Sequence, residues 1–136
     1  MNIDVMRKWI NALRSGVYEQ GVNALGARIL VDGVATDRFC ATGVLCELAV
    51  KEGLINRTEQ PQICLPFSRV SFRYNGHEWS IPAEVFAWLG VEEWPADNLI
   101  VYIAILNDEH RFSFENIANY LQDELDNYII KLVLKS

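Results

Sequence analysis

The sequence predicts an α+β fold, a compact single domain over residues 1–136 in which four or more helices pack on a small antiparallel β-hairpin sheet. The 136 residues are enough for one domain with its own core, and 51% of them are hydrophobic. Apolar residues recur at helical spacing in several segments that end at glycines. An Asn-Gly pair between two runs of alternating residues predicts a hairpin.

The N-terminal third predicts two helices separated by a loop. Apolar residues at i, i+3 and i+4 spacing indicate a helix over about 3–15, which Asn2 or Asp4 begins and Gly16 ends. Residues 16–40 contain four glycines and no long periodic segment, so we expect an ordered loop with one short strand at 28–31. A second apolar stripe predicts a helix over about 41–52, ended by Gly53.

The middle of the chain predicts the hairpin. Residues 57–66 form a polar segment with two prolines, which is typical of a connector. Alternating residues on both sides of Asn75-Gly76 predict strands at 68–74 and 77–81. Pro82 then fits the first turn of a helix that Gly90 ends, and a turn follows at 92–97.

The C-terminal third predicts two more helices. Residues 98–106 favour a short helix over a strand because a turn and a capped helix follow them. Ser113 is the expected N-cap of that last helix. The apolar tail at 128–134 either extends this helix or forms a strand. Its apolar residues need to be buried, either against this chain or against a second copy in a homodimer. We expect these residues in the core: Trp9, Leu13, Leu45, Leu48, Phe72, Phe86, Leu89, Ile117 and Leu121.

Charge is uneven along the chain, whose formal net charge is −6. Residues 92–126 contain nine acidic residues against Arg111 as the one strong base, a balance of −8. The negative field of this window repels phosphate, so we expect no direct DNA binding. Two interpretations stay open, a solvated surface or an acidic face for a host protein. The residues of that partner-binding face would be Glu115, Asp123, Glu124 and Asp126.

Cysteine usage and hydropathy predict a cytoplasmic protein with no cofactor. The three cysteines are an odd number, and no secretory signal precedes them, so we expect reduced thiols. The longest apolar run has eight residues, too short to span a membrane. Cys40 and Cys46 lack the spacing of a zinc pair, so we expect no metal site and a buried, hydrophobic role for Cys46.

No catalytic motif stands out, so we expect a non-enzymatic protein. Asp108, His110 and Ser113 are the residue types of a nucleophilic triad, but Ser113 already has a function as a helix cap. The sequence contains no phosphate-binding glycine loop and no nucleophile elbow.

Two polar clusters are candidates for ligand binding. Residues 14–20 combine a guanidinium, an aromatic ring and an amide, and residues 107–111 precede a helix N-terminus with free N–H groups. The alternatives are a loop folded over the core for the first and an ordinary helix–helix turn for the second. The ligand-binding candidates are Arg14, Tyr18, Gln20, Asn107, Asp108 and Arg111.

Taken together, four segments resemble a widespread family of small proteins from tailed phages and prophages. The resemblance covers roughly residues 9–125 and is carried by W-x2-ALRSG-x-Y-x-Q from Trp9, FC-x2-GVLC from Phe39, LND from Leu106 and SF-x2-IA from Ser113. Family members commonly have a second cysteine where Ala41 stands, and a glycine in the turn where His110-Arg111 stand. The resemblance implies a phage accessory role in the cytoplasm of an infected bacterium, with no catalytic residues to carry over.

Two functional hypotheses follow from these patterns. In the first, the protein acts against the host by binding and sequestering a small, nucleotide-like signal. In the second, the acidic C-terminal region mimics nucleic acid and inhibits a host defence or nucleic-acid-processing protein.

Overall fold

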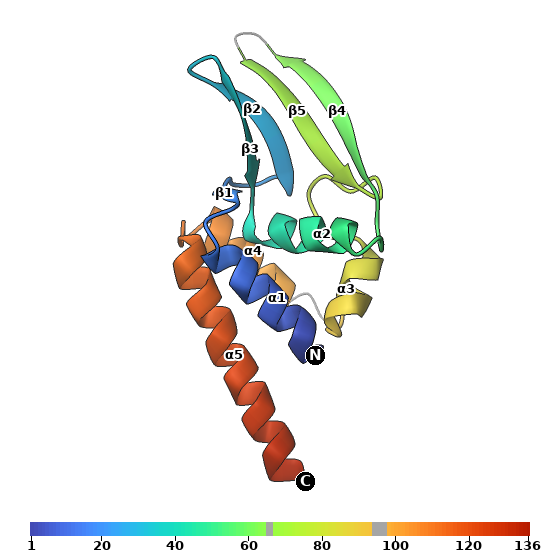
Figure 1. The fold of residues 1–136 in the computed structure, drawn as a ribbon, viewed down its shortest axis with the longest axis vertical. Helices are drawn as coiled ribbons and strands as arrows, with labels where there is room; N and C mark the ends of the chain where they lie inside the picture. Colours follow the sequence, from blue (N-terminus) through green and yellow to red (C-terminus); the bar gives the residue numbers. More distant parts are fainter. Residues whose placement is uncertain (65–66, 94–97) are drawn as a thin grey trace.

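The computed structural model describes residues 1–64, 67–93 and 98–136, and confirms the α+β prediction. Figure 1 shows the helices gathered at one end of the molecule, with the strands rising from α2 on the other side. Among the described residues, no helix is both long enough and apolar enough to cross a bilayer. The elements in chain order are α1 (Ile3–Arg14), β1 (Glu19–Gln20), β2 (Gly26–Val31), β3 (Val34–Phe39), α2 (Ala41–Lys51), β4 (Arg57–Cys64), β5 (Phe67–Tyr74), α3 (Ala83–Leu89), α4 (Leu99–Asp108) and α5 (Phe114–Lys135).

The sheet is larger than the expected hairpin. Its strand order is β1-β3-β2-β5-β4. The short β1 pairs parallel to β3, and the other neighbours are antiparallel. The central pairing, β2 with β5, joins two hairpins that are far apart in sequence.

The prediction of a loop over most of 16–40 was wrong, because β2 and β3 form a hairpin there. Asp32 and Gly33 take φ values of 50° and 79°, the conformation of a type I′ turn. Asp-Gly is a strong signal for that turn. The hairpin was not predicted because the residues on both sides of this turn do not alternate cleanly between polar and apolar.

The prediction of a connector at 57–66 was also wrong. Residues 57–64 form β4, which pairs with β5 along its whole length. β4 is an edge strand, where proline is tolerated because one side of the strand has no partner for its N–H groups. Its polar composition reflects this edge position.

The expected strand at 77–81 does not form. The Asn75-Gly76 turn is present, with φ values of 50° and 85°, and Tyr74 and His77 exchange hydrogen bonds of 2.8 and 2.9 Å. The pairing ends at this one bridge. Both edges of β5 are already occupied by β2 and β4, so 77–81 has no edge to join.

Most helix predictions are confirmed, and their caps explain the boundaries. Asn2 accepts a hydrogen bond from the Val5 N–H, and Ser113 accepts one from the Asn116 N–H. Residues 99–108 are helical, as favoured, and the tail continues α5 as a helix. Part of the turn predicted at 92–97 lies outside the described residues.

The core lies between the helices and the near end of the sheet. Of the nine residues expected there, seven are buried, and Leu48 and Phe86 are half-buried. The fully buried Trp9 donates from Nε1 to the Ala41 carbonyl at 2.9 Å, which ties α1 to the start of α2. Gly43 lies in that start, so close to the Leu25 backbone that an added Cβ would meet its carbonyl oxygen.

Replacing Gly43 by Ala should therefore destabilise the fold strongly, by at least about 3 kcal/mol, because backbone must move to admit the methyl group. Gly33→Ala is the matched control: Gly33 has a positive φ but open space around it, so the cost should be about 1–2 kcal/mol. Urea unfolding of both variants measures the difference. Equal costs would show that the contact between α2 and Leu25 is not tight.

Candidate functional site

The two polar clusters singled out from the sequence meet in the structure. Gln20 donates from Nε2 to Asn107 Oδ1 at 2.9 Å and to the Phe112 carbonyl at 2.7 Å. Its Oε1 accepts from the Phe114 N–H at 3.1 Å. These hydrogen bonds of Gln20 hold β1 against the turn between α4 and α5.

Asn107 is the centre of this contact and is fully buried. Its Nδ2 donates to the Gly21 carbonyl at 2.9 Å, and its Oδ1 accepts from the Ala41 N–H at 3.1 Å. Asp108 accepts from Asn107 Nδ2 at 2.8 Å and from the Asn23 N–H at 2.9 Å. We call Gln20, Asn107 and Asp108 the polar latch, since their polar groups bond to the protein itself.

Arg14 and Tyr18 bond elsewhere. Arg14 donates from Nη2 to Asn119 Oδ1 at 2.9 Å, on the outside of α5. Tyr18 accepts at its hydroxyl from Lys51 Nζ at 2.8 Å and meets the Phe39 ring edge-on. The six ligand-binding candidates are therefore divided among several places, and their role in binding stays a prediction.

The acidic residues of α5 are spread around the helix. At 3.6 residues per turn, Glu115 and Asp126 lie about 20° apart, Asp123 about 80° from Glu115, and Glu124 about 180° from it. Glu115 lies 4.0 Å from Arg14 Nε, and Asp126 accepts from Gln122 Nε2 at 3.0 Å. Burial, and then Glu124, raise the pKa of Tyr120 to about 12.

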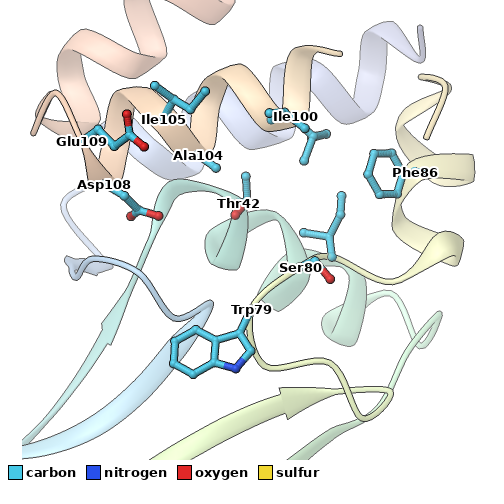
Figure 2. Close-up of a pocket in the computed structure, with 11 residues that line it drawn as sticks. Thr42, Trp79, Ser80, Phe86, Ile100, Ala104, Ile105, Asp108 and Glu109 are labelled. Atoms are coloured by element: carbon cyan, nitrogen blue, oxygen red, sulfur yellow. The ribbon is translucent and has the colours of Figure 1, made fainter. Parts of the chain in front are cut away.

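An apolar cavity of about 320 Å³ lies beside α4. Figure 2 shows Phe86 of α3 and Ile100 of α4 on one side of it and the indole of Trp79 at a distance on the other. Thr42 and Asp108 are among its few polar lining residues. Its mainly apolar lining suits an apolar or aromatic group, and the carboxylates of Asp108 and Glu109 make it unfavourable for an anion.

A second cavity, of about 300 Å³, lies beside the loop at 21–25 and is lined by arginines. Arg38 comes from β3, Arg69 from β5 and Arg111 from the turn before α5. We call it the arginine pocket. Its other lining residues are small or apolar, apart from Gln20: Gly21, Val22, Ala24, Gly26, Ala27 and Ile29.

Strand register explains why these arginines meet. Ala27 pairs with Arg38 on one side and with Ser71 on the other, and Ile29 pairs with Arg69. Paired residues share a face of a sheet, so Arg38 and Arg69 project from the same face. Their Nε atoms are buried without a hydrogen-bond partner. A buried donor left unpaired is costly, and an acceptor from a ligand would satisfy it.

The arginines on the other face of the sheet are neutralised. Arg28 donates to Asp37 at 2.8 Å and to Glu59 at 3.2 Å, and these carboxylates raise the pKa of Arg28. Arg57 pairs with Glu47 and lies over the Phe72 ring at 4.4 Å. In the described part of the chain, Arg38, Arg69 and Arg111 have no ion pair.

Arg111 is also strained. Its φ is 56°, in the left-handed region that favours glycine. A non-glycine residue there costs about 1–2 kcal/mol. Strain of this kind is often found at functional sites. Of the three pocket arginines, sequence reasoning had singled out only this one. The Asp-Gly turn at 32–33 is the signal that would have placed Arg38 on a strand.

The described residues contain no group of three or more His, Cys, Asp or Glu side chains that could hold a metal ion. Cys40 and Cys46 are buried free thiols, and burial raises the pKa of both. Cys40 caps α2 by accepting from the Gly43 N–H at 3.3 Å. Both thiols lie among core residues and pack there as small hydrophobic groups.

Replacing Asn107 by Ala should cost about 2–4 kcal/mol, because the Ala41 N–H and the Gly21 carbonyl lose their partner in a buried place. Asn119→Ala is the control, since Asn119 is exposed and accepts from Arg14, and its cost should stay within about 0.5 kcal/mol. Chemical denaturation measures both. A mild effect at Asn107 would show that water replaces the amide.

Comparison with known proteins supplies the family. The model of a domain of unknown function, DUF8296, matches residues 1–125. Neither the search of curated proteins nor the search of solved structures found a match. The matched residues include the whole polar latch and all three pocket arginines, and they exclude the end of α5. Since the match covers most of the chain, this protein belongs to the DUF8296 family.

Proposed function

We propose that this protein is a non-enzymatic binding protein whose arginine pocket takes a small, anionic, nucleotide-like ligand. The observation that carries the proposal is the contrast between the two faces of one sheet. Arg28 and Arg57 are satisfied by carboxylates, whereas Arg38 and Arg69 keep buried donors without partners.

The chemistry of guanidinium favours phosphate as the bound group. Its planar fork of N–H donors matches two phosphate oxygens at once, and it stays charged at any physiological pH. Three guanidinium groups from β3, β5 and the turn before α5 supply such forks from different directions. Half-buried stems of Arg38 and Arg69 restrict their motion, which lowers the entropic cost of binding.

The size of the pocket limits the ligand. A volume of about 300 Å³ is at the small end for ligand pockets, and the lining is fixed by strands and by the latched loop. A phosphorylated sugar or one nucleotide unit suits this volume better than a nucleic-acid duplex.

The resemblance to small tailed-phage proteins suggests a setting for such binding. In an infected bacterium, a protein that sequesters a nucleotide-like signal would silence a host response that depends on it. The alternative, an acidic inhibitor that mimics nucleic acid, has less support because Glu115 and Glu124 lie on opposite sides of α5.

Calorimetric titration with linear and cyclic nucleotides and with pyrophosphate tests the proposal. We expect at least one phosphate compound to bind, and Arg38→Ala or Arg69→Ala to weaken it at least tenfold because a charged, partly desolvated contact is lost. Binding should weaken with added salt.

Arg7→Ala is the matched control, since Arg7 is an exposed arginine of α1 outside the pocket, and it should bind like the unmodified chain. Failure of the whole panel to bind at millimolar concentration would sink the proposal. So would equal effects of Arg7→Ala and Arg38→Ala.

The variant Arg111→Gly distinguishes an effect on ligand affinity from an effect on the free energy of unfolding. Glycine relieves the left-handed backbone, so the unfolding free energy should stay the same or rise by up to about 1 kcal/mol. Ligand affinity should nevertheless fall, because one guanidinium is missing from the pocket. Thermal unfolding and calorimetry on the same sample measure the two effects. Unchanged affinity would remove Arg111 from the site.

A further inference from the structure

The last turns of α5 carry an exposed apolar patch. Ile130, Val133 and Leu134 are 55%, 66% and 80% exposed. α1 packs along the earlier part of α5, and its Met1 amino group donates to the Tyr128 hydroxyl at 3.4 Å. Figure 1 shows α5 continuing past the N-terminus of α1 to the far end of the molecule. Clustered apolar exposure of this kind marks an interaction surface more often than single exposed residues do.

A groove of about 440 Å³ between α4 and α5 is a second unpartnered apolar surface. α4 has no charged residue before Asp108, and its outer side exposes Val101 at 38% and Tyr102 at 42%. Tyr120 of α5 packs on Tyr102 with ring centroids 5.0 Å apart. Glu124 lines the groove and is its one acidic residue.

The charges along one side of α5 can pair with the same side of α5 in a second, antiparallel copy. Tyr120, Glu124, Asn127, Lys131 and Lys135 follow one another at spacings of three or four residues, so they form a single stripe. An acidic residue stands at one end of this stripe, and two lysines stand at the other. A second copy running antiparallel therefore meets opposite charges at both ends.

We propose that the end of α5 from a second copy occupies the α4–α5 groove, and that the protein is a homodimer. Antiparallel pairing about a two-fold axis near residues 127–128 places each Lys131 opposite the other copy's Glu124. Leu134 then lies near the apolar groove. Each copy supplies both halves of the contact, as a two-fold interface requires. The arginine pocket takes no part, so the dimer is independent of the proposed ligand.

The overlap is long enough for a specific contact. Residues 120–135 span about 24 Å at 1.5 Å per residue. Over that length the two stripes bring together Tyr120 and Asn127 flanked by ion pairs, with Leu134 at their border, whereas Val133 lies about 180° from Glu124 and stays outside the contact. The family match ends at residue 125, so most of the docking segment lies outside the matched region.

Sedimentation equilibrium of the full chain tests the dimer. We expect a concentration-dependent dimer that Glu124→Lys weakens at least tenfold by setting lysine against Lys131. Combining Glu124→Lys with Lys131→Glu should restore dimerisation. Asp126→Lys makes the same charge change about 160° away on α5, so it should leave the dimer intact.

Leu134→Ser should weaken the dimer without unfolding the chain, because Leu134 is exposed in the monomer. Circular dichroism confirms that each variant folds. A monomer at all accessible concentrations would overturn the proposal. A dimer that Glu124→Lys and Asp126→Lys weaken equally, or that the charge exchange fails to restore, would also overturn it.

Discussion

One buried amide joins three separate parts of this chain. Asn107, at the end of α4, donates to the loop after β1 and accepts from the first N–H of α2, while Gln20 reaches it from β1. A polar group in such a place must have partners, and here they come from residues 20–21 and from the start of α2. The amide therefore fixes where the loop at 21–25 runs, and that loop forms a wall of the arginine pocket.

The distribution of charge in space differs from its distribution along the chain. The acidic window at 92–126 suggested that the protein repels anions, and Arg111 appeared there as an isolated base. Folding brings Arg111 beside Arg38 and Arg69, which come from two strands 31 positions apart in sequence. The net charge of a segment thus bears on the solubility of the protein and on its long-range electrostatic field. Strand register instead decides where a local group of positive side chains forms.

Sequence reasoning succeeded where the determinants are local. The helices and the caps at Asn2 and Ser113 follow from residues within one or two turns. The sheet depends on pairing between distant segments: β5 joins β2 and β4, and an edge strand such as β4 needs no alternating pattern. Arg38 and Arg69 were missed for the same reason, since they become neighbours only when β2 pairs with both β3 and β5.

The loop at 21–25 lines the arginine pocket, and its backbone is bonded to residues at or next to the apolar cavity. Val22 lines the first, while the Asn23 N–H bonds to Asp108 and the Leu25 N–H bonds to the Glu78 carbonyl, beside Trp79 of the second. A ligand that displaced this loop from the arginine pocket would also pull on its hydrogen bonds to Asp108 and Glu78. If ligands bound in both cavities and both shifted the loop, thermodynamic linkage would require each to change the affinity of the other by the same factor.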